Sequence, residues 1–309
     1  MGLFDFLFGR AEKSKPAQTP ASKSAKKPQA ELDYSRELIT KEIAPGISLP
    51  AAFESQWSQI KGTAIHTIQI KANVSENLTL AQSKFGHFPM MPAGADYPKD
   101  SQGAFMYPLA QLNFSEIPEL EGYPRSGYLQ FYISITDDAF GMDFENPQSQ
   151  VNFRVLFFED EEVKDFRSDF AFLEETLRSD MSPVYKPHVL QFEKKTDYLG
   201  AADFRSSFHP AFNLTRFIAA YPEDVADELA TAAWDTFGCN GHKIGGYAYF
   251  TQSDPREKEE ESGKYILLFQ LDTDDEIMWG DCGVANFFIH PDDLAKKDFS
   301  KVLFNWDCC

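Results

Sequence analysis

Short apolar runs alternate with polar turns along most of the chain, and this pattern predicts a protein rich in β-strands. Four runs have the length and the aromatic or β-branched composition of strands, at residues 127–135, 151–158, 265–271 and 282–289. Loops rich in Gly, Pro and Asp separate them, as is typical of antiparallel sheets with short connections. We therefore expect mainly antiparallel β-structure.

Helical spacing of apolar residues is confined to a few segments. The clearest helix is predicted between Tyr221 and Gly238, because Pro222 suits the first turn and Gly can end a helix. Two further helices are predicted at 34–43 and 165–178. A few helices beside many strands indicate the α+β class.

Blocks of sequence in the second half of the chain echo blocks in the first half, in the same order. Such self-similarity indicates an internal duplication, here of two related β-rich halves at roughly 50–160 and 210–305. The echoed blocks are KFG (84–86) with KIG (243–245) and LAQLN (109–113) with LFQLD (268–272) at an offset of 159, and GYLQFYI (127–133) with GVANFFI (283–289) at an offset of 156.

The first 31 residues differ in composition from the rest. Residues 11–31 consist largely of Lys, Ala, Pro and Ser and contain no large apolar side chain, so we expect 1–31 to be a flexible segment and linker, and 32–309 a single domain. The apolar residues 1–8 fit either a frayed end or a short docking peptide. They lack the basic start and the longer apolar run of a secretory signal, and no run of about 18 apolar residues follows, which predicts a cytoplasmic protein without a membrane span.

The charge of the chain is strongly acidic. It contains 29 Lys and Arg against 48 Asp and Glu, a net charge of −19. Residues 1–30 contain six basic and two acidic residues, so the remaining chain carries a net charge of −23. This balance argues against a nucleic-acid binder that works by neutralising phosphates and against adhesion to anionic membranes.

Polar residues at equivalent places of the two halves are the candidate ligand-binding residues. Gln at the end of a buried strand can pair with free backbone groups or line a polar groove between the halves, and the sequence leaves both open. If the halves meet about a pseudo-two-fold axis, we expect these side chains to face one central region. The candidates are Gln111, Asn113, Gln270, Asp272, Asp274, Trp279 and Asp281.

The acidic segment 272–276 does not have the sequence of a calcium loop. An EF-hand needs Gly at its sixth position and an acid at its twelfth, where this chain has Ile277 and Gly283. A solvated acidic turn or a less regular cation site remains as an interpretation. Asp281 between two glycines suits a tight turn, and Trp279 suits either a core or the apolar wall of a pocket.

Enzyme signatures are missing from the sequence. It contains no G-x-S-x-G, H-E-x-x-H, phosphate-binding loop or G-x-G-x-x-G motif, and its six His are scattered. The four Cys lack paired spacing, which predicts free thiols; Cys239 and His242 are only half of a zinc pattern. We therefore assign no catalytic residue, no metal and no cofactor.

Several long motifs are similar to the YwqG-like family, a bacterial group described as a domain of unknown function. The similarity extends over about residues 45–309, with departures at Gly86-His87 and Ala248. The motifs are KFGHFPMMPAGADYP (84–98), PLAQLNFSEIP (108–118), GYLQFYIS (127–134), KIGGYAYFTQSDPRE (243–257), LLFQLDTDDEIMWGDCGVANFFI (267–289) and the final HPDDLAKKDFSKVLFNWDCC.

The resemblance implies one α+β unit with two related halves and no established activity. Members of this family often occur beside polymorphic toxin genes, which implies an immunity-type or toxin-neutralising role. Two hypotheses follow: a binding protein that acts through an acidic surface or cleft, and an enzyme or small-ligand protein with an acidic site between the halves. An acidic inhibitor of a basic toxin would gain association rate from electrostatic steering.

Overall fold

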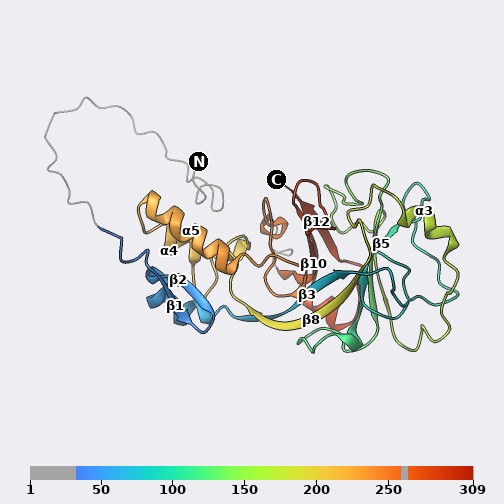
Figure 1. Ribbon diagram of the computed structural model, residues 1–309, viewed down its shortest axis with the longest axis horizontal. Coiled ribbons are helices and arrows are strands. Elements are labelled where there is room, and N and C mark those ends of the chain that lie inside the picture. The colour runs from blue at the N-terminus through green and yellow to red at the C-terminus, as the bar shows by residue number, and fades with distance from the viewer. Residues whose placement is uncertain (1–32, 259–263, 309) are drawn as a thin grey trace, which may run out of the picture. The chain divides into compact units, whose positions relative to one another are not determined.

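The computed structural model describes residues 33–258 and 264–308, which form two compact units (Figure 1). The first unit comprises residues 33–64 and 198–238, and the second comprises 65–197 and 239–308. The predicted N-terminal segment, residues 1–31, lies outside the described residues. The strand pairs that echo each other in sequence all belong to the second unit.

The first unit packs short helices on a β-hairpin. Helix α5 starts directly after Pro222 and ends before Gly238, which confirms the predicted helix, and its apolar stripe, with Leu229 fully buried, faces the core of this unit. The elements are β1 (Thr40–Ala44), β2 (Ile47–Pro50), η1 (Ala51–Gln56), α2 (Trp57–Lys61), η4 (Phe204–Ser207), α4 (Leu214–Ile218) and α5 (Glu223–Phe237).

The helix predicted at 34–43 is wrong. Residues 40–44 form strand β1 because Pro45 and Gly46 close a tight hairpin, with Gly46 at a φ of 75° and Ala44 opposite Ile47. Pairing with β2 therefore overrides the weak helical spacing of this segment.

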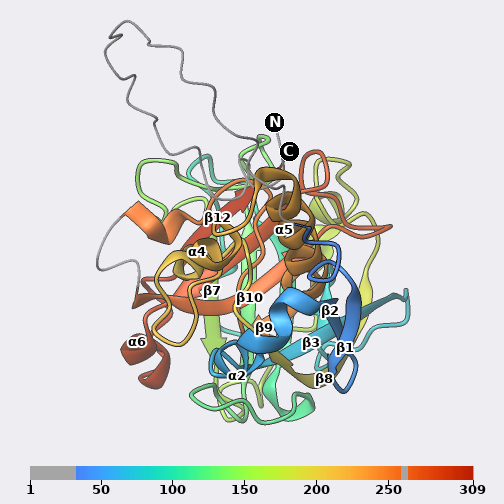
Figure 2. The same cartoon turned by 90° about the vertical axis from the view of Figure 1, so that its left-hand side faces the viewer.

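The second unit is built on one antiparallel sheet of ten strands, in the order β12-β11-β10-β9-β3-β8-β4-β5-β6-β7. Strands β12, β10, β9, β3 and β8 can be followed in this order in Figure 2. The strands are β3 (Ile65–Val74), β4 (Lys84–Phe85), β5 (Tyr107–Asn113), β6 (Tyr128–Ile133), β7 (Phe153–Phe158), β8 (His188–Asp197), β9 (Lys243–Gly245), β10 (Ile266–Asp272), β11 (Val284–Ile289) and β12 (Leu303–Asp307).

Helical structure in this unit is short. The segment predicted as a helix at 165–178 contains only η3 (Ala171–Leu173) and α3 (Glu174–Leu177), and the remaining short turns are η2 (Phe114–Glu116), η5 (Pro255–Lys258) and α6 (Pro291–Ala295). The four predicted strands are confirmed as β6, β7, β10 and β11. Mostly antiparallel β-structure with few helices is therefore the observed architecture.

Strand order is the same when read inward from either edge of the sheet. Strands β7, β6, β5 and β4 run from one edge to β8, and β12, β11, β10 and β9 run from the other edge to β3. The long strands β3 and β8 pair with each other along their whole length in the middle. We call the two sets, with their loops, the first half and the second half of the unit.

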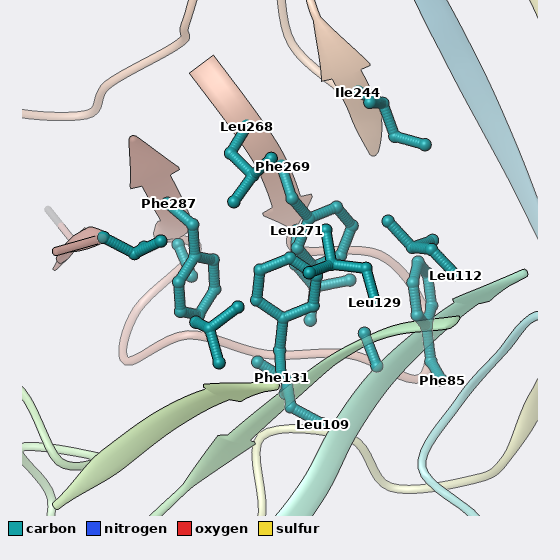
Figure 3. Close-up of a cluster of buried hydrophobic side chains, with 14 of the residues drawn as sticks. Phe85, Leu109, Leu112, Leu129, Phe131, Ile244, Leu268, Phe269, Leu271 and Phe287 are labelled. Carbon is teal, nitrogen blue, oxygen red and sulfur yellow. The ribbon is translucent and has the colours of Figure 1, made fainter. Parts of the chain in front are cut away.

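Aromatic rings join the two halves in one core. The sheet curls so that Phe131 of β6 packs against Phe269 of β10 and Phe287 of β11, with ring centroids 4.8 and 4.7 Å apart. Phe85 of β4 lies 5.9 Å from Phe269. Figure 3 shows Phe131 directed toward Phe269 and Phe287, with leucines of both halves around them. The inner face of the curled sheet is therefore filled with apolar side chains.

Candidate functional site

Gln111 binds backbone groups of irregular segments that cross the outer face of the first half. Its Oε1 accepts the N–H of Met90 at 2.6 Å, and its Nε2 donates to the carbonyls of Leu80 at 2.8 Å and Gln82 at 2.9 Å. The side chain is 2 % exposed. Each polar atom of Gln111 is thus used inside the fold.

Gln270 makes the same set of bonds in the second half. Its Oε1 accepts the N–H of Tyr249 at 2.8 Å, and its Nε2 donates to the carbonyls of Cys239 at 3.0 Å and Gly241 at 2.7 Å. Each of these residues stands 159 positions after its counterpart in the first half. The two glutamines are therefore equivalent. We call each glutamine with its three backbone partners the hydrogen-bonded frame of its half.

The prediction that the two glutamines face one central region is wrong. Gln270 alternates along β10 with Phe269 and Leu271, which lie in the core between the halves. Gln111 bonds the side chain of Gln130, which alternates with core Phe131 on β6. Both glutamines therefore lie on the outer face of the sheet, each within its own half, because the inner face is occupied by aromatic rings.

Gln130 and Asn286 are a second pair of equivalent polar residues. They share one hydrogen bond, made by the side-chain nitrogen, and differ in the partner of the side-chain oxygen. Gln130 Nε2 donates to the carbonyl of Met90, and its counterpart Asn286 donates to the carbonyl of Tyr249. Gln130 Oε1 accepts the hydroxyl of Tyr132 at 2.6 Å. Asn286 Oδ1 is buried and has no hydrogen-bond partner among the described residues. Phe288 stands where the first half has Tyr132, so no hydroxyl is available there.

Replacing Tyr132 by phenylalanine is expected to lower the free energy of unfolding by about 1–3 kcal/mol, because it leaves Gln130 Oε1 buried without a donor. Tyr128→Phe is the matched control on the same strand, since no hydrogen bond is observed for its hydroxyl within the described part of the chain. Urea unfolding measures both. Equal stability of the two variants would contradict the assigned bond.

The two buried lysines that pair with these glutamines have different surroundings. Lys243 lies opposite Gln270 and donates to Asp197 Oδ2 at 2.8 Å. Lys84 lies opposite Gln111, and within residues 33–258 and 264–308 it donates to backbone carbonyls alone, of Thr79 at 2.6 Å and Leu80 at 2.8 Å. Burial lowers the pKa of Lys84 to about 7, and the charge of Glu116 offsets this only in part.

The pKa of Lys84 predicts a pH-dependent stability. Between about pH 7 and 10.5 the unfolded chain holds a proton on this lysine that the folded chain does not hold, so stability should rise with pH in this window. The contribution approaches about 1.4 kcal/mol per pH unit. Lys84→Met should remove that part of the slope.

Urea unfolding at pH 7.5, 8.5 and 9.5 measures this effect as the difference between the wild type and Lys84→Met. Lys243→Met is the matched control, because Lys243 has a carboxylate partner in the folded protein. Parallel pH profiles of the wild type and Lys84→Met would refute the assignment.

Asn113 and Asp272 are the last residues of the equivalent strands β5 and β10. The backbone N–H of each donates to a side chain, which is a serine in one half and a histidine in the other. The backbone N–H of Asn113 donates to Ser83 Oγ at 2.9 Å. The backbone N–H of Asp272 donates to His242 Nδ1 at 3.0 Å, and Asp272 Oδ2 accepts the N–H of Gly241 at 2.6 Å. Asp272 is thereby tied to the chain and is 8 % exposed.

Asp274 and His242 form a hydrogen-bonded pair at the end of β10. His242 Nδ1 accepts a backbone N–H, so its proton resides on Nε2, which donates to Asp274 Oδ2 at 3.0 Å. Asp274 Oδ1 accepts the N–H of Glu276 at 2.8 Å. Burial raises the pKa of Asp274, but these hydrogen bonds and the nearby imidazoles outweigh it, and the pKa lies below its usual value. Asp274 is therefore a carboxylate at neutral pH.

His188 lies beside this pair. Its ring packs edge-on against Phe85, with centroids 6.3 Å apart, and Phe85 also contacts His242 at 5.4 Å. Burial lowers the pKa of His188, and the charge of Asp274 acts in the opposite direction. His188 is 2 % exposed, and its ring hydrogen-bonds the backbone of Lys186. We call His188, His242 and Asp274 the histidine–aspartate cluster.

The turn that carries Asp274 is fixed by the chain that leads into β8. Val184 forms a β-bridge with Ile277, and the N–H of Tyr185 donates to the carbonyl of Glu276 at 2.9 Å. Lys186 Nζ lies 2.6 Å from Glu276 Oε1. These contacts bring a segment of the chain 90 residues away in sequence against the acidic turn.

Trp279 belongs to the core rather than to the histidine–aspartate cluster, and its backbone N–H donates to Thr273 Oγ1 at 3.2 Å. Trp279 is fully buried and packs on Phe140 and Trp306, with centroids 5.4 and 6.0 Å apart. Trp306 Nε1 donates to the carbonyl of Ala139 at 2.8 Å. Asp281 is exposed in the turn that follows. Asp281 follows two residues after Trp279, which contacts Phe140 of the loop 137–145.

The exposed surface of the loop 137–145 and the turn 280–282 is acidic and carries one aromatic ring. Loop 137–145 contains four carboxylates and neither Lys nor Arg. Phe144 within it is 77 % exposed. We call loop 137–145 and the turn 280–282 together the acidic loop surface. Its carboxylates are Asp137, Asp138, Asp143, Glu145 and Asp281.

Sequence reasoning named Asp274, considered His242 only as half of a zinc pattern, and missed His188 and Phe144. His242 directly precedes the repeated Lys-Ile-Gly block, where the first half has Ser83, so a departure from the repeat was the available signal. His188 carried no such signal, because its place beside Asp274 depends on pairing between distant strands.

Comparison with known proteins gives a family. The family model described as Domain of unknown function (DUF1963) matches residues 83–308. No curated protein matches the chain in sequence. In the part of the chain that the structure describes, no helix is long and apolar enough to cross a membrane, and no three His, Cys, Asp or Glu side chains are grouped to hold a metal ion.

Proposed function

The chain belongs to the DUF1963 family, and we propose that it is a cytoplasmic binding protein that holds a basic protein partner through the acidic loop surface. The observation that carries this proposal is the exposure of Phe144, 77 %, in a loop that otherwise presents carboxylates. An exposed aromatic residue within a polar rim is typical of the anchors that dominate interface energies. Carboxylates without neighbouring Lys or Arg favour a positively charged partner.

Aromatic packing under the surface supports the proposal. Phe140, Trp279 and Trp306 pack together beneath the loop, and Phe140 adopts a φ of 52°, which fixes the course of the chain. A surface held in one conformation loses less entropy on binding than a mobile one. The net charge of −23 outside residues 1–30 would also steer a basic partner toward the protein.

The finer form of the proposal is an immunity-type factor of the YwqG-like kind. A toxin-neutralising protein needs a fast association with a basic toxin, and an acidic surface provides it. The sequence motifs that resemble the YwqG-like family support this form. An enzyme or a small-ligand protein remains the second candidate, and the histidine–aspartate cluster is the observation that favours it.

We also propose that the two halves of the second unit arose by internal duplication. The equal strand order from both edges supports this origin. The bonds of Gln111 and Gln270 support it more strongly, because three backbone partners of each recur at one constant offset. Residues that repeat then belong to the frame, and residues that differ are candidates for function.

Affinity capture with the full chain tests the binding proposal. The wild type is immobilised, native-host lysate is applied at low and at physiological salt, and the retained proteins are quantified by mass spectrometry. We expect a basic protein to be retained, and Phe144→Ser or the triple variant Asp137→Asn/Asp138→Asn/Glu145→Gln to lose at least nine-tenths of it.

The control carries the same change of charge elsewhere on the second unit. Glu76→Gln/Glu121→Gln/Asp180→Asn replaces three other exposed carboxylates and should retain the partner. If both triple variants lose capture equally, net charge and not this surface is responsible, and the proposal fails. Capture of an acidic protein would also contradict it.

A further inference from the structure

Two of the cysteines lie at the same end of the strand pair β11–β12. Cys282 comes two residues before β11, and Cys308 directly follows β12. Val284 is paired with Asp307 at this end of the two antiparallel strands. Gly283 continues the close approach, because a Cβ at its position would clash with the carbonyl oxygen of Asp307. Cys282 and Cys308 therefore belong to two chain segments that still adjoin beyond the last strand pair.

The thiol of Cys308 faces the turn that contains Cys282. The N–H of Gly283 donates to the carbonyl of Trp279 at 2.7 Å and closes this turn. A Cβ built on Gly280, inside the turn, would lie 2.6 Å from Cys308 Sγ. Gly280 and Cys282 are two residues apart, so their Cα atoms are separated by at most about 7 Å. The thiol of Cys308 therefore lies against the turn that carries the thiol of Cys282.

The two cysteines carry free thiols that differ in exposure, since Cys282 is exposed and Cys308 is partly buried. Cys282 adopts a φ of 67°, a left-handed conformation that glycine takes without cost and cysteine does not. The turn itself therefore does not explain a cysteine at this place. Within residues 33–258 and 264–308, no third ligating side chain joins the two thiols to hold a metal ion, so a reaction between the thiols is favoured over a shared metal.

We propose that Cys282 and Cys308 form a reversible disulfide when the protein is exposed to hydrogen peroxide. The exposed thiol reacts first: the sulfur of Cys282 attacks the O–O bond, forms a sulfenic acid and releases one water. The sulfur of Cys308 then attacks that sulfur, the S–O bond breaks, and a second water leaves. Two electrons thus pass from the two thiols to one peroxide molecule. A dithiol reductant reverses the bond by thiol–disulfide exchange.

The place of the two residues suits such a bond. Disulfides join Cα atoms about 4.4–6.8 Å apart, and residues that meet across an antiparallel pair have Cα atoms about 4.5–5.5 Å apart. The bond would fasten the turn 280–282, which is part of the acidic loop surface, to the end of β12. Its formation does not depend on the proposed function, and its test involves no partner.

The test follows the thiols of the full chain. Reduced protein is treated with about a tenfold excess of hydrogen peroxide, free thiols are blocked with N-ethylmaleimide, and tryptic peptides are identified by mass spectrometry without reduction. Cys309 follows Cys308 in the sequence, so the wild type and Cys309→Ser are treated in parallel. We expect the peptides 265–296 and 302–309 to be linked in both proteins, and the link to be lost on treatment with dithiothreitol.

Two further variants identify the thiols that react. Cys239→Ser is the control and should give the linked peptides in the same yield as the wild type. Cys282→Ser should remove the link and slow the loss of the Cys308 thiol at least tenfold. A link that is present in the wild type and absent from Cys309→Ser would assign the bond to Cys309 and overturn the proposal. Absence of the link, or its presence only in disulfide-bonded dimers on a non-reducing gel, would also overturn it.

Discussion

Gln270→Leu is expected to lower the free energy of unfolding by at least about 3 kcal/mol. The substitution removes the bonds to the N–H of Tyr249 and to two carbonyls, all within a fully buried part of the outer face. Each buried group left unsatisfied costs about 1–3 kcal/mol, and leucine offers no replacement. Urea unfolding followed by circular dichroism measures the loss.

Two further variants separate this effect from a general intolerance of leucine. Gln191→Leu changes an exposed glutamine of β8 and should alter stability by less than about 0.5 kcal/mol. Gln111→Leu should be as damaging as Gln270→Leu, because the two glutamines hold equivalent segments. A Gln270→Leu protein as stable as the Gln191→Leu protein would show that the frame does not depend on this side chain.

Asp197→Asn should destabilise the protein by about 3–5 kcal/mol. Asparagine preserves the shape of the side chain but removes the carboxylate that forms the ion pair with the ammonium of Lys243, which is 1 % exposed. The backbone N–H of Tyr247 keeps an acceptor, since Asn Oδ1 replaces the carboxylate oxygen. The loss therefore reports the buried charge and not the hydrogen bond.

The double variant Asp197→Asn/Lys243→Met provides the control for this prediction. Removing both charges should recover most of the lost stability, because a methionine in place of the buried lysine needs no partner. The measurement is the unfolding midpoint in urea for the wild type, both single variants and the double variant. A double variant no more stable than Asp197→Asn would contradict the role assigned to the ion pair.

Four of the twelve strands could be predicted from the sequence because their apolar runs are bounded by turn residues. Tyr128–Ile133 and Val284–Ile289 lie within their predicted ranges. The segment 34–43 failed because its apolar spacing fits a helix while Pro45 and Gly46 impose a hairpin. Local spacing does not reveal which partner strand is available, and that partner decides the outcome.

The candidate site was predicted less well, for a reason visible at Gln270. Alternation along a strand shows that Gln270 and Phe269 point to opposite faces, but it does not say which face lies between the halves. In the structure Phe269 points to the face between the halves, so Gln270 points to the outer face and belongs to the hydrogen-bonded frame. The cluster around Asp274 depends on His188, which reaches it through the pairing of β8 with β4 and could not be found from spacing.

The central claim is that a basic partner binds the acidic loop surface, and its association rate tests this most directly. For the captured partner, the association rate constant is measured by surface plasmon resonance between 50 and 500 mM salt. The wild type should show a steep decline with salt. Asp137→Asn/Asp138→Asn/Glu145→Gln should flatten it, and Glu76→Gln/Glu121→Gln/Asp180→Asn should not. Identical salt dependence in all three proteins would contradict the account.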